Sequence, residues 1–230
     1  MRPGLRRGAR IDLRHVRERL EQGDALWPAQ AAVAVAIALN FGLSKEVLVG
    51  PRWLLPGVEA VLLVWLVAIA PRRATEHSPT RRRLALTLIG LVSLTNLVTL
   101  GLLVHFLING GKVRGHALVL SGTIAWLTNV LLFAVWYWEL DRGGPAARYL
   151  DPARLPDFQF PQMENPHLAP EGWRPGFVDY LYTSLTNATA FSPTDTMPLT
   201  PIAKTLMGVQ SLAALVTVGL VVARAVNILG

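Results

Sequence analysis

Long apolar stretches alternate with short polar ones along this chain. Five of them approach the length of about twenty predominantly apolar residues that a membrane-spanning helix needs. Tryptophans near their ends fit the headgroup zone, which favours amphipathic rings. The pattern therefore predicts an all-α membrane protein with five transmembrane helices, roughly at residues 27–43, 53–70, 84–108, 117–140 and 201–229.

A further segment, residues 177–199, is too short to cross a bilayer and too rich in hydroxyl groups to face lipid. Short apolar runs of about 10–14 residues are typical of re-entrant or interfacial pieces. Irregular backbone at membrane depth is tolerated where it is buried in protein or lines water. We therefore expect a re-entrant pore-helix hairpin, in which a short helix enters the membrane and a polar loop leads back to the last spanning helix.

These segments group into an N-terminal part and a pore-like unit. Residues 1–26 are basic and form either an amphipathic helix on the cytoplasmic surface or a solvated leader. No internal repeat is evident, so a transporter built from duplicated halves is not expected. N-terminal transmembrane helices occupy 27–116, and the pore-like unit occupies 117–230, with an outer helix at 117–140, a proline-rich loop at 141–176, the re-entrant helix and loop at 177–199, and an inner helix at 200–229.

The proline-rich loop is predicted to be ordered. Its many prolines disfavour regular helix and favour extended or turn backbone. Apolar side chains at Leu155, Phe158, Phe160 and Met163 would be unnecessary in a solvated linker. We therefore expect this loop to pack over the membrane domain.

Composition supports a membrane protein and restricts its partners. Of the 230 residues, 52% are hydrophobic, and the formal net charge is +7. Arginines are concentrated before the first helix and in residues 71–83, and basic residues in short loops mark the cytoplasmic side. We therefore expect a cytoplasmic N-terminus, contact with lipid headgroups, and no nucleic-acid partner. The preference for arginine over lysine fits a bacterial source, and hence a multi-pass protein of the bacterial inner (plasma) membrane.

The loop after the short helix carries the residues suited to a cation path. Hydroxyl and carbonyl oxygens are hard donors that suit small monovalent or divalent cations. Asp195 would form an acidic ring at a mouth or, alternatively, an Asx turn that stabilises the loop. The pore or filter candidates are Thr186, Asn187, Thr189, Phe191, Ser192, Thr194 and Asp195.

Two further groups of residues belong to the same hypothesis. Asp179 lies in the first turn of the short helix, where a carboxylate caps free amides or, alternatively, acts directly on an ion. Gln210, Thr217 and Arg224 follow one another at seven-residue spacing, so they share one face of the inner helix. That face either lines a conduit or faces protein, and Arg224 alternatively extends toward the headgroups.

Other chemistry is poorly supported by the sequence. The chain has no cysteine, which excludes disulfides and thiolate chemistry. Nothing resembles a metal cluster, a nucleophile with its base or a phosphate-binding glycine loop, so we expect no enzyme activity, no cofactor and no resident metal. Glu59 and His105 are costly groups within apolar segments. They leave open a third function, a proton-coupled carrier.

The residues around the hairpin carry a resemblance. Tyr182-Thr-Ser-Leu-Thr186, Pro198-Leu-Thr-Pro-Ile-Ala-Lys-Thr-Leu206 and Val221-Val-Ala-Arg-Ala-Val226 resemble the pore region of two-transmembrane potassium channels. The Val-Gly-Tyr-Gly filter of that family is absent, so potassium selectivity is not implied. Three other stretches look like an uncharacterised family of bacterial integral membrane proteins: Trp136-Tyr-Trp-Glu-Leu-Asp-Arg-Gly-Gly-Pro145, Ala190-Phe-Ser-Pro-Thr-Asp-Thr-Met-Pro198 and Ala223-Arg-Ala-Val-Asn-Ile-Leu229.

The sequence therefore predicts an oligomeric, channel-like protein that passes small cations with weak or atypical selectivity. One pore loop cannot enclose a path, so a homo-oligomer is required, and a tetramer is the simplest. The alternative is a nonconducting membrane protein whose hairpin and proline-rich loop serve packing or docking of a partner.

Overall fold

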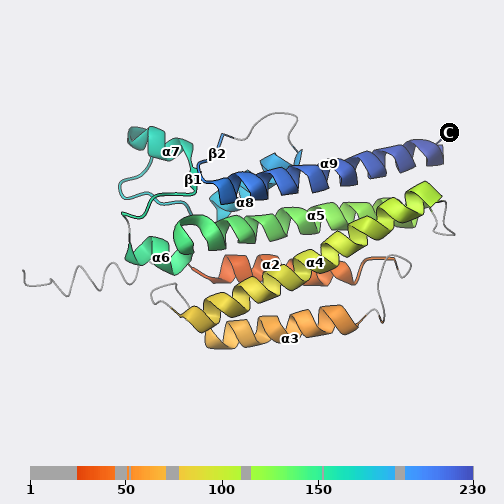
Figure 1. The fold of residues 1–230 in the computed structure, drawn as a ribbon, viewed down its shortest axis with the longest axis horizontal. Coiled ribbons are helices and arrows are strands. Elements are labelled where there is room, and N and C mark those ends of the chain that lie inside the picture. Colours follow the sequence, from red (N-terminus) through yellow and green to blue (C-terminus); the bar gives the residue numbers. More distant parts are fainter. Residues whose placement is uncertain are drawn as a thin grey trace, which may run out of the picture.

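The computed structural model describes residues 25–44, 51, 53–70, 78–109, 115–151, 153–189 and 195–229. The predicted amphipathic segment 1–26 lies almost wholly outside these residues. The described chain is mostly helical (Figure 1). Its main helices are α2 (Trp27–Asn40), α3 (Leu54–Ile69), α4 (Pro79–Asn109), α5 (Gly115–Leu140), α8 (Phe177–Thr189) and α9 (Pro201–Leu229).

Three of the described helices, α4, α5 and α9, are long and apolar enough to cross a membrane. The protein is therefore a helical, membrane-associated protein. Helices α2 and α3 are apolar but have 14 and 16 residues. At about 1.5 Å per residue they extend about 21 and 24 Å, against a hydrocarbon core of about 30 Å.

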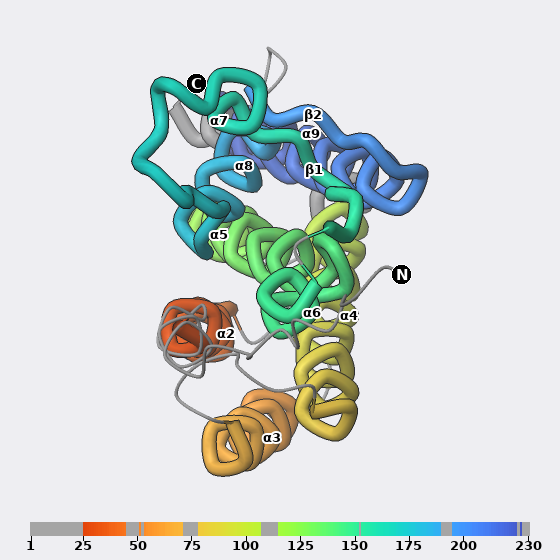
Figure 2. Tube along the Cα trace, turned by 90° about the vertical axis from the view of Figure 1, so that its left-hand side faces the viewer, coloured from red at the N-terminus to blue at the C-terminus, as the bar shows by residue number. Residues whose placement is uncertain are grey.

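Helix α5 is the centre of the bundle. It packs against α9, α8, α4 and α2, while α3 lies outside against α4 and α2 (Figure 2). Its side chains Tyr137 and Trp138 are among the largest that are fully buried. Gly122 of α5 allows a close approach of α9, because a Cβ atom there would lie 2.5 Å from Cγ2 of Val221.

One end of the bundle is covered by the segment that follows α5. It contains η2 (Asp141–Gly143), α6 (Pro145–Leu150), β1 (Phe158–Gln159), α7 (Pro161–Glu164) and η3 (Pro166–Leu168). Strand β1 pairs antiparallel with β2 (Met197–Pro198), with Phe158 opposite Pro198. We call these elements the cap.

The cap is ordered, but its details differ from the sequence prediction. The expectation of no regular helix is wrong, because short helices begin at Pro145, Pro161 and Pro166. Proline is well suited to the first helical position, where its missing N–H has no acceptor to lose. Phe158 and Phe160 are buried anchors as expected, whereas Leu155 is 84% exposed.

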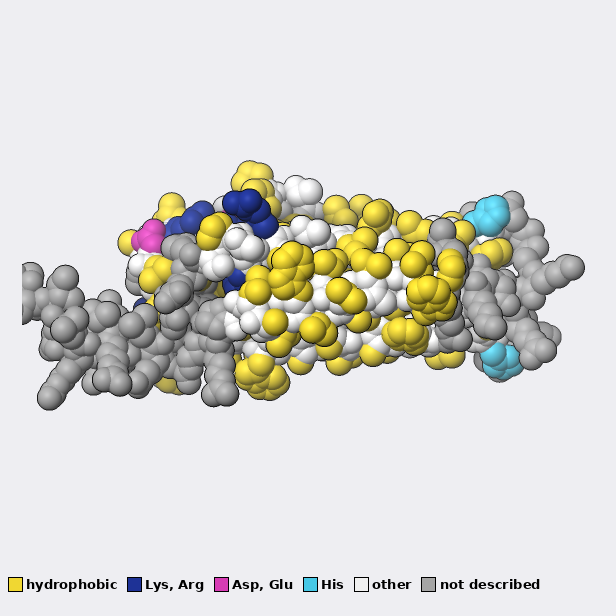
Figure 3. Space-filling model, turned by 90° about the horizontal axis from the view of Figure 1, so that it is seen from below, with side chains coloured by type: hydrophobic (Ala, Val, Ile, Leu, Met, Phe, Trp, Pro, Cys, Tyr) yellow, Lys and Arg dark blue, Asp and Glu magenta, His cyan; other side chains and the backbone are white. Residues whose placement is uncertain are grey.

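The surface divides along the length of the bundle. On the face shown in Figure 3, hydrophobic side chains cover the middle, and the Lys, Arg, Asp and Glu side chains gather at one end. Large apolar side chains are widely exposed on α3 and α9, including Val64 and Leu212. An apolar middle with charged groups at one end is the surface that a bilayer accommodates.

Candidate functional site: the α8 hairpin

Helix α8 begins at the cap and has 13 residues, which corresponds to about 20 Å. The carboxylate of Asp179 accepts a 2.7 Å hydrogen bond from the backbone N–H of Gly176. This is the geometry of an N-terminal cap, in which a side chain three residues into the helix satisfies the amide that precedes it. Asp179, which the sequence predicted to cap the N-terminus of this helix, therefore lies where it can do so.

The chain returns to the same end of the bundle after α8. The hydroxyls of Thr183 and Thr196 lie 3.1 Å apart, so the returning strand passes beside the middle of α8. Strand β2 then pairs with β1, whose Phe158 ring packs edge-on against Tyr180 in the first turns of α8. The described parts of this segment therefore start and finish at the cap.

Polar side chains fasten α8 between α5 and α9. Gln210 of α9 donates hydrogen bonds to the carbonyl and the hydroxyl of Ser184, at 2.9 and 2.7 Å. Its own carbonyl oxygen accepts from Asn187 at 2.8 Å and from the hydroxyl of Tyr137. Because Gln210 is completely buried, these bonds replace the water it would otherwise need. We call these residues, with Ser211, the Gln210 network.

The hydrogen bonds of this network reach backbone groups as well. Ser184 donates to the carbonyl of Val130 at 2.7 Å, and Asn187 donates to the carbonyl of Met207 at 3.0 Å. Ser211 donates to the amide oxygen of Asn187 at 3.0 Å. Hydrogen bonds from the polar face of α8 therefore hold this helix to both α5 and α9.

A recess of about 410 Å³ lies at the C-terminal end of α8, between α5 and α9. Its lining includes the polar residues Asn187, Thr189 and Ser211 and the apolar residues Leu212 and Leu215. The indole of Trp126, also in its wall, donates to the carbonyl of Ala188 at 3.4 Å. The recess thus brings the negative end of the α8 dipole next to an open space.

The predicted pore residues are only partly described. Thr186, Asn187 and Thr189 form the last turn of α8, and Asp195 is exposed just before β2. The hydroxyls of Thr186 and Thr189 bond to carbonyls of their own helix, at 2.8 and 3.0 Å. Phe191, Ser192 and Thr194 lie outside the described residues.

The polar row on α9 faces protein within one chain. Gln210 and Thr217 are buried, and Arg224 is half-buried nearer the far end of the helix. Thr217 bonds to the carbonyl of Ala213 in its own helix. The sequence left open whether this polar face lines a conduit or faces protein. Within one chain, Gln210 and Thr217 are buried against the protein. Lining of a conduit by this face stays a prediction.

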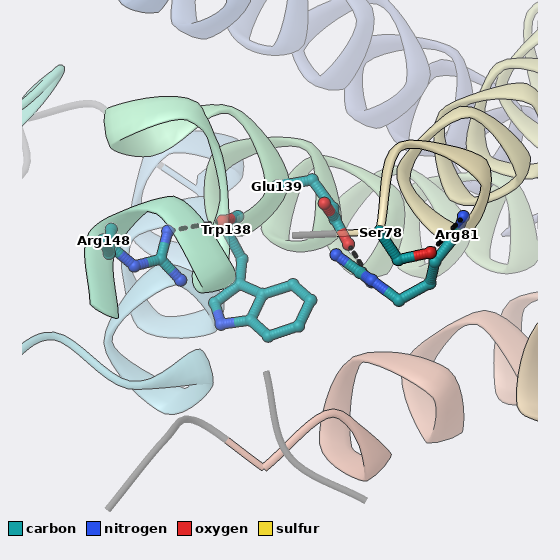
Figure 4. A network of polar contacts seen from close by, with 5 residues as sticks. All are labelled: Ser78, Arg81, Trp138, Glu139 and Arg148. Atoms are coloured by element: carbon teal, nitrogen blue, oxygen red, sulfur yellow. Dashed lines mark hydrogen bonds and ion pairs between the residues drawn. The ribbon is translucent and has the colours of Figure 1, made fainter. Parts of the chain in front are cut away.

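A second group of buried polar contacts, which was not predicted from the sequence, lies where α4, α5 and the cap meet. Arg81 of α4 and Glu139 of α5 form an ion pair of 3.1 Å, with both side chains almost fully buried (Figure 4). Arg148 of α6 donates to the carbonyls of Trp138 and Asp141, at 2.6 and 3.1 Å. A cation that binds the last carbonyls of a helix satisfies groups that have no partner within the helix.

The rings around Arg148 complete this arrangement. Its guanidinium lies 5.7 Å from the ring centre of Trp138 and 5.1 Å from that of Tyr180. The signal in the sequence was the run of charges Glu139, Asp141 and Arg142, which begins in the last turn of an apolar helix and continues just after it. Such a run normally indicates a solvated loop, and only the fold reveals that part of it is buried.

A buried carboxyl group also lies between α2, α3 and α4. Glu59 accepts hydrogen bonds from Thr95 at 3.0 Å and from Asn40 at 3.4 Å. His105 lies ten residues beyond Thr95 on α4, which is about 15 Å along the helix. The two residues of the carrier hypothesis are therefore separated along the bundle.

Within the described ranges, no group of three or more His, Asp or Glu side chains is placed to hold a metal ion. Comparisons with protein-family models, with curated proteins and with solved structures find no match for this chain.

Proposed function

We propose that this protein is an oligomeric, channel-like membrane protein that passes small cations past the α8 hairpin. The observation that carries the proposal is the half-length helix α8 together with the return of the chain to the cap. In a bilayer, that geometry corresponds to a re-entrant hairpin among five spanning helices, with α2 and α3 as the two short spans. The arginines of α4 near the cap make that end cytoplasmic under the positive-inside rule.

The chemistry at the end of α8 supports the same proposal. The C-terminal end of a helix carries a partial negative charge, and here it points toward the recess. Several such ends around an axis favour a cation at the centre. A single chain has one hairpin, so the path requires several copies, and a tetramer is the simplest assembly.

The test is cation flux through purified protein in liposomes. Asp195→Asn removes an exposed carboxylate next to the hairpin, and flux is expected to fall because a cation loses an attractive charge at the mouth. Glu171→Gln, which removes an exposed carboxylate from the cap, is the matched control and should leave flux unchanged. Wild-type protein that passes no cation under any gradient or voltage would overturn the proposal.

A second candidate function is a nonconducting membrane protein in which the hairpin packs the bundle. The observation that favours it is the Gln210 network, which uses the polar face of α8 for contacts within the chain. This candidate predicts a monomer in native lipid. A ring of subunits, measured by mass in the same lipid, favours the channel.

A further inference from the structure

Helices α4 and α9 share a sequence pattern that the sequence analysis did not recognise. Residues 85–104 and 203–222 are identical at twelve of twenty aligned positions, at a constant offset of 118. The expectation of no internal repeat is therefore wrong for these two helices. The shared residues are Ala85, Thr87, Leu88, Gly90, Ser93, Leu94, Leu97, Val98, Thr99, Gly101, Leu102 and Val104, which correspond to Ala203, Thr205, Leu206, Gly208, Ser211, Leu212, Leu215, Val216, Thr217, Gly219, Leu220 and Val222.

The two helices also use the shared residues in the same way. Each packs on α5, and both run from the cap toward the opposite end (Figure 1). Thr99 and Thr217, at equivalent positions, are each 3% exposed and belong to the inward face. On the outward face, each helix presents leucines that are about equally exposed: Leu94 at 58% and Leu212 at 66%.

The outward leucines lie between glycines on both helices. The row is Gly90, Leu94, Leu97 and Gly101 on α4, and Gly208, Leu212, Leu215 and Gly219 on α9. Their spacing of four, three and four residues puts all four on one side of each helix. We call these the α4 row and the α9 row.

Contacts within the described part of the chain do not explain the glycines of these rows. A Cβ atom added at any of the four would meet no atom of the described residues within 4 Å. Where glycine serves packing inside this chain the situation differs: a Cβ at Gly122 would meet Val221 at 2.5 Å, and one at Gly42 would meet Ile124 at 2.8 Å. Glycine weakens a helix relative to alanine, and on membrane helices small residues let the backbone of another helix approach.

The α9 row also borders the recess at the end of α8. Leu212 and Leu215 line the recess together with the polar residues Asn187 and Ser211. Polar groups that face hydrocarbon are costly, so such a recess needs protein or water over it. A neighbouring helix packed on the α9 row would cover the recess, whereas a lipid acyl chain has no group that can hydrogen-bond to Asn187 or Ser211.

We propose that the α4 row of one copy of this chain packs on the α9 row of the next copy. One chain carries both matching rows, and in copies that share one membrane orientation the two helices run parallel. A contact between different surfaces of identical subunits closes into a ring when the rotation allows it. The inference rests on the oligomer that the proposed function requires. In that assembly, the α4 row of the neighbouring copy would cover the recess.

Disulfide cross-linking tests this directly, because the natural chain has no cysteine. Chains carrying Leu94→Cys and chains carrying Leu212→Cys are co-expressed, and the membranes are oxidised. The expected result is a disulfide-linked dimer from the mixture, and none from either chain alone. The matched control replaces Leu94→Cys with Val64→Cys, an equally exposed position on α3, and should give no dimer.

A dimer yield no higher than that of the Val64 control would overturn the inference. Self-linking of the Leu212→Cys chain would also overturn it, because it would mean that α9 meets α9. Gly208→Leu provides a second measurement, and it should still fold because a Cβ atom at this exposed position meets no described residue within 4 Å. It is expected to reduce the dimer yield at least tenfold, while Val209→Leu, beside the row, leaves the yield unchanged. An intact dimer yield in Gly208→Leu would also contradict the inference.

The cross-link is independent of conduction. Cross-linked dimers without cation flux would refute the channel proposal and support the contact between the rows. Cation flux without cross-linking would refute the proposed contact and leave the channel proposal in place.

Discussion

The hydroxyl of Tyr180 donates a 2.5 Å hydrogen bond to the carboxylate of Asp141, and both side chains are completely buried. The bond joins the first turns of α8 to the end of α5. The other carboxylate oxygen of Asp141 accepts the backbone N–H of Asp157 at 2.8 Å, beside β1. One carboxylate thus sets the position of both the hairpin entrance and the strand that receives its return.

Tyr180→Phe should therefore destabilise the fold. It leaves one oxygen of a buried carboxylate without its donor, and such a loss costs about 1–3 kcal/mol. The measurement is the free energy of unfolding in detergent micelles. Tyr182→Phe, on the exposed side of the same helix, is the control and should change little. Equal stabilities of the two variants would contradict the role assigned to Asp141.

Arg81→Met should be more damaging. It leaves Glu139 buried without its counter-charge, and breaking a buried ion pair in this way costs about 3–5 kcal/mol. Arg83→Met, two residues away and exposed, is the matched control. The double variant Arg81→Met/Glu139→Leu should recover most of the loss, since apolar replacement of a buried pair is often neutral. Failure of this rescue would show that the ion pair is not the cause.

Gln210→Leu distinguishes packing from conduction. Gln210 makes several hydrogen bonds of the Gln210 network, so their loss in Gln210→Leu should lower the free energy of unfolding by about 1–3 kcal/mol. Ser211→Ala, which removes one bond to Asn187, should cost less. Thermal unfolding and cation flux are measured on the same preparations. A changed selectivity with unchanged unfolding would instead favour Gln210 as a lining residue.

Gly122→Ala should disturb the contact between α5 and α9. The new methyl group would lie 2.5 Å from Val221, and overpacking of this kind costs about 1–3 kcal/mol. Gly57→Ala is the control, because a Cβ there meets nothing within 4 Å and alanine favours helix. Unfolding in micelles is expected to separate the two variants in opposite directions. A stabilised Gly122→Ala would refute the close approach.

Much of the helical layout is predictable because apolar periodicity and length are local properties. The predicted inner helix, 201–229, coincides with α9, and the predicted second helix, 53–70, differs from α3 by one residue at each end. Asp179 was found because a cap is decided within one turn. The recess at the end of α8 was not predictable, because its walls come from three helices far apart in the sequence.

The buried charges of the cap escaped prediction for a different reason. A sequence gives no sign that Arg148 binds the carbonyls of Trp138 in α5 and Asp141 in η2, since that depends on the turn at η2. The seven-residue spacing predicted that Gln210 and Thr217 share one face of α9, and both side chains are buried. The Gln210 partners Ser184 and Asn187 could not be named, because the position of α8 between α5 and α9 is a tertiary fact.

The unequal lengths of α3 and α9 have a consequence for the surrounding lipid. If α3 spans the bilayer as proposed, lipid beside it meets an apolar wall about 24 Å high, whereas α9, with 29 residues, extends about 43 Å. A bilayer adapts to such mismatch by thinning beside a short helix and by tilting a long one. In that arrangement the molecule would deform the membrane asymmetrically, and bilayer thickness would act on the α3 flank more than on the α9 flank.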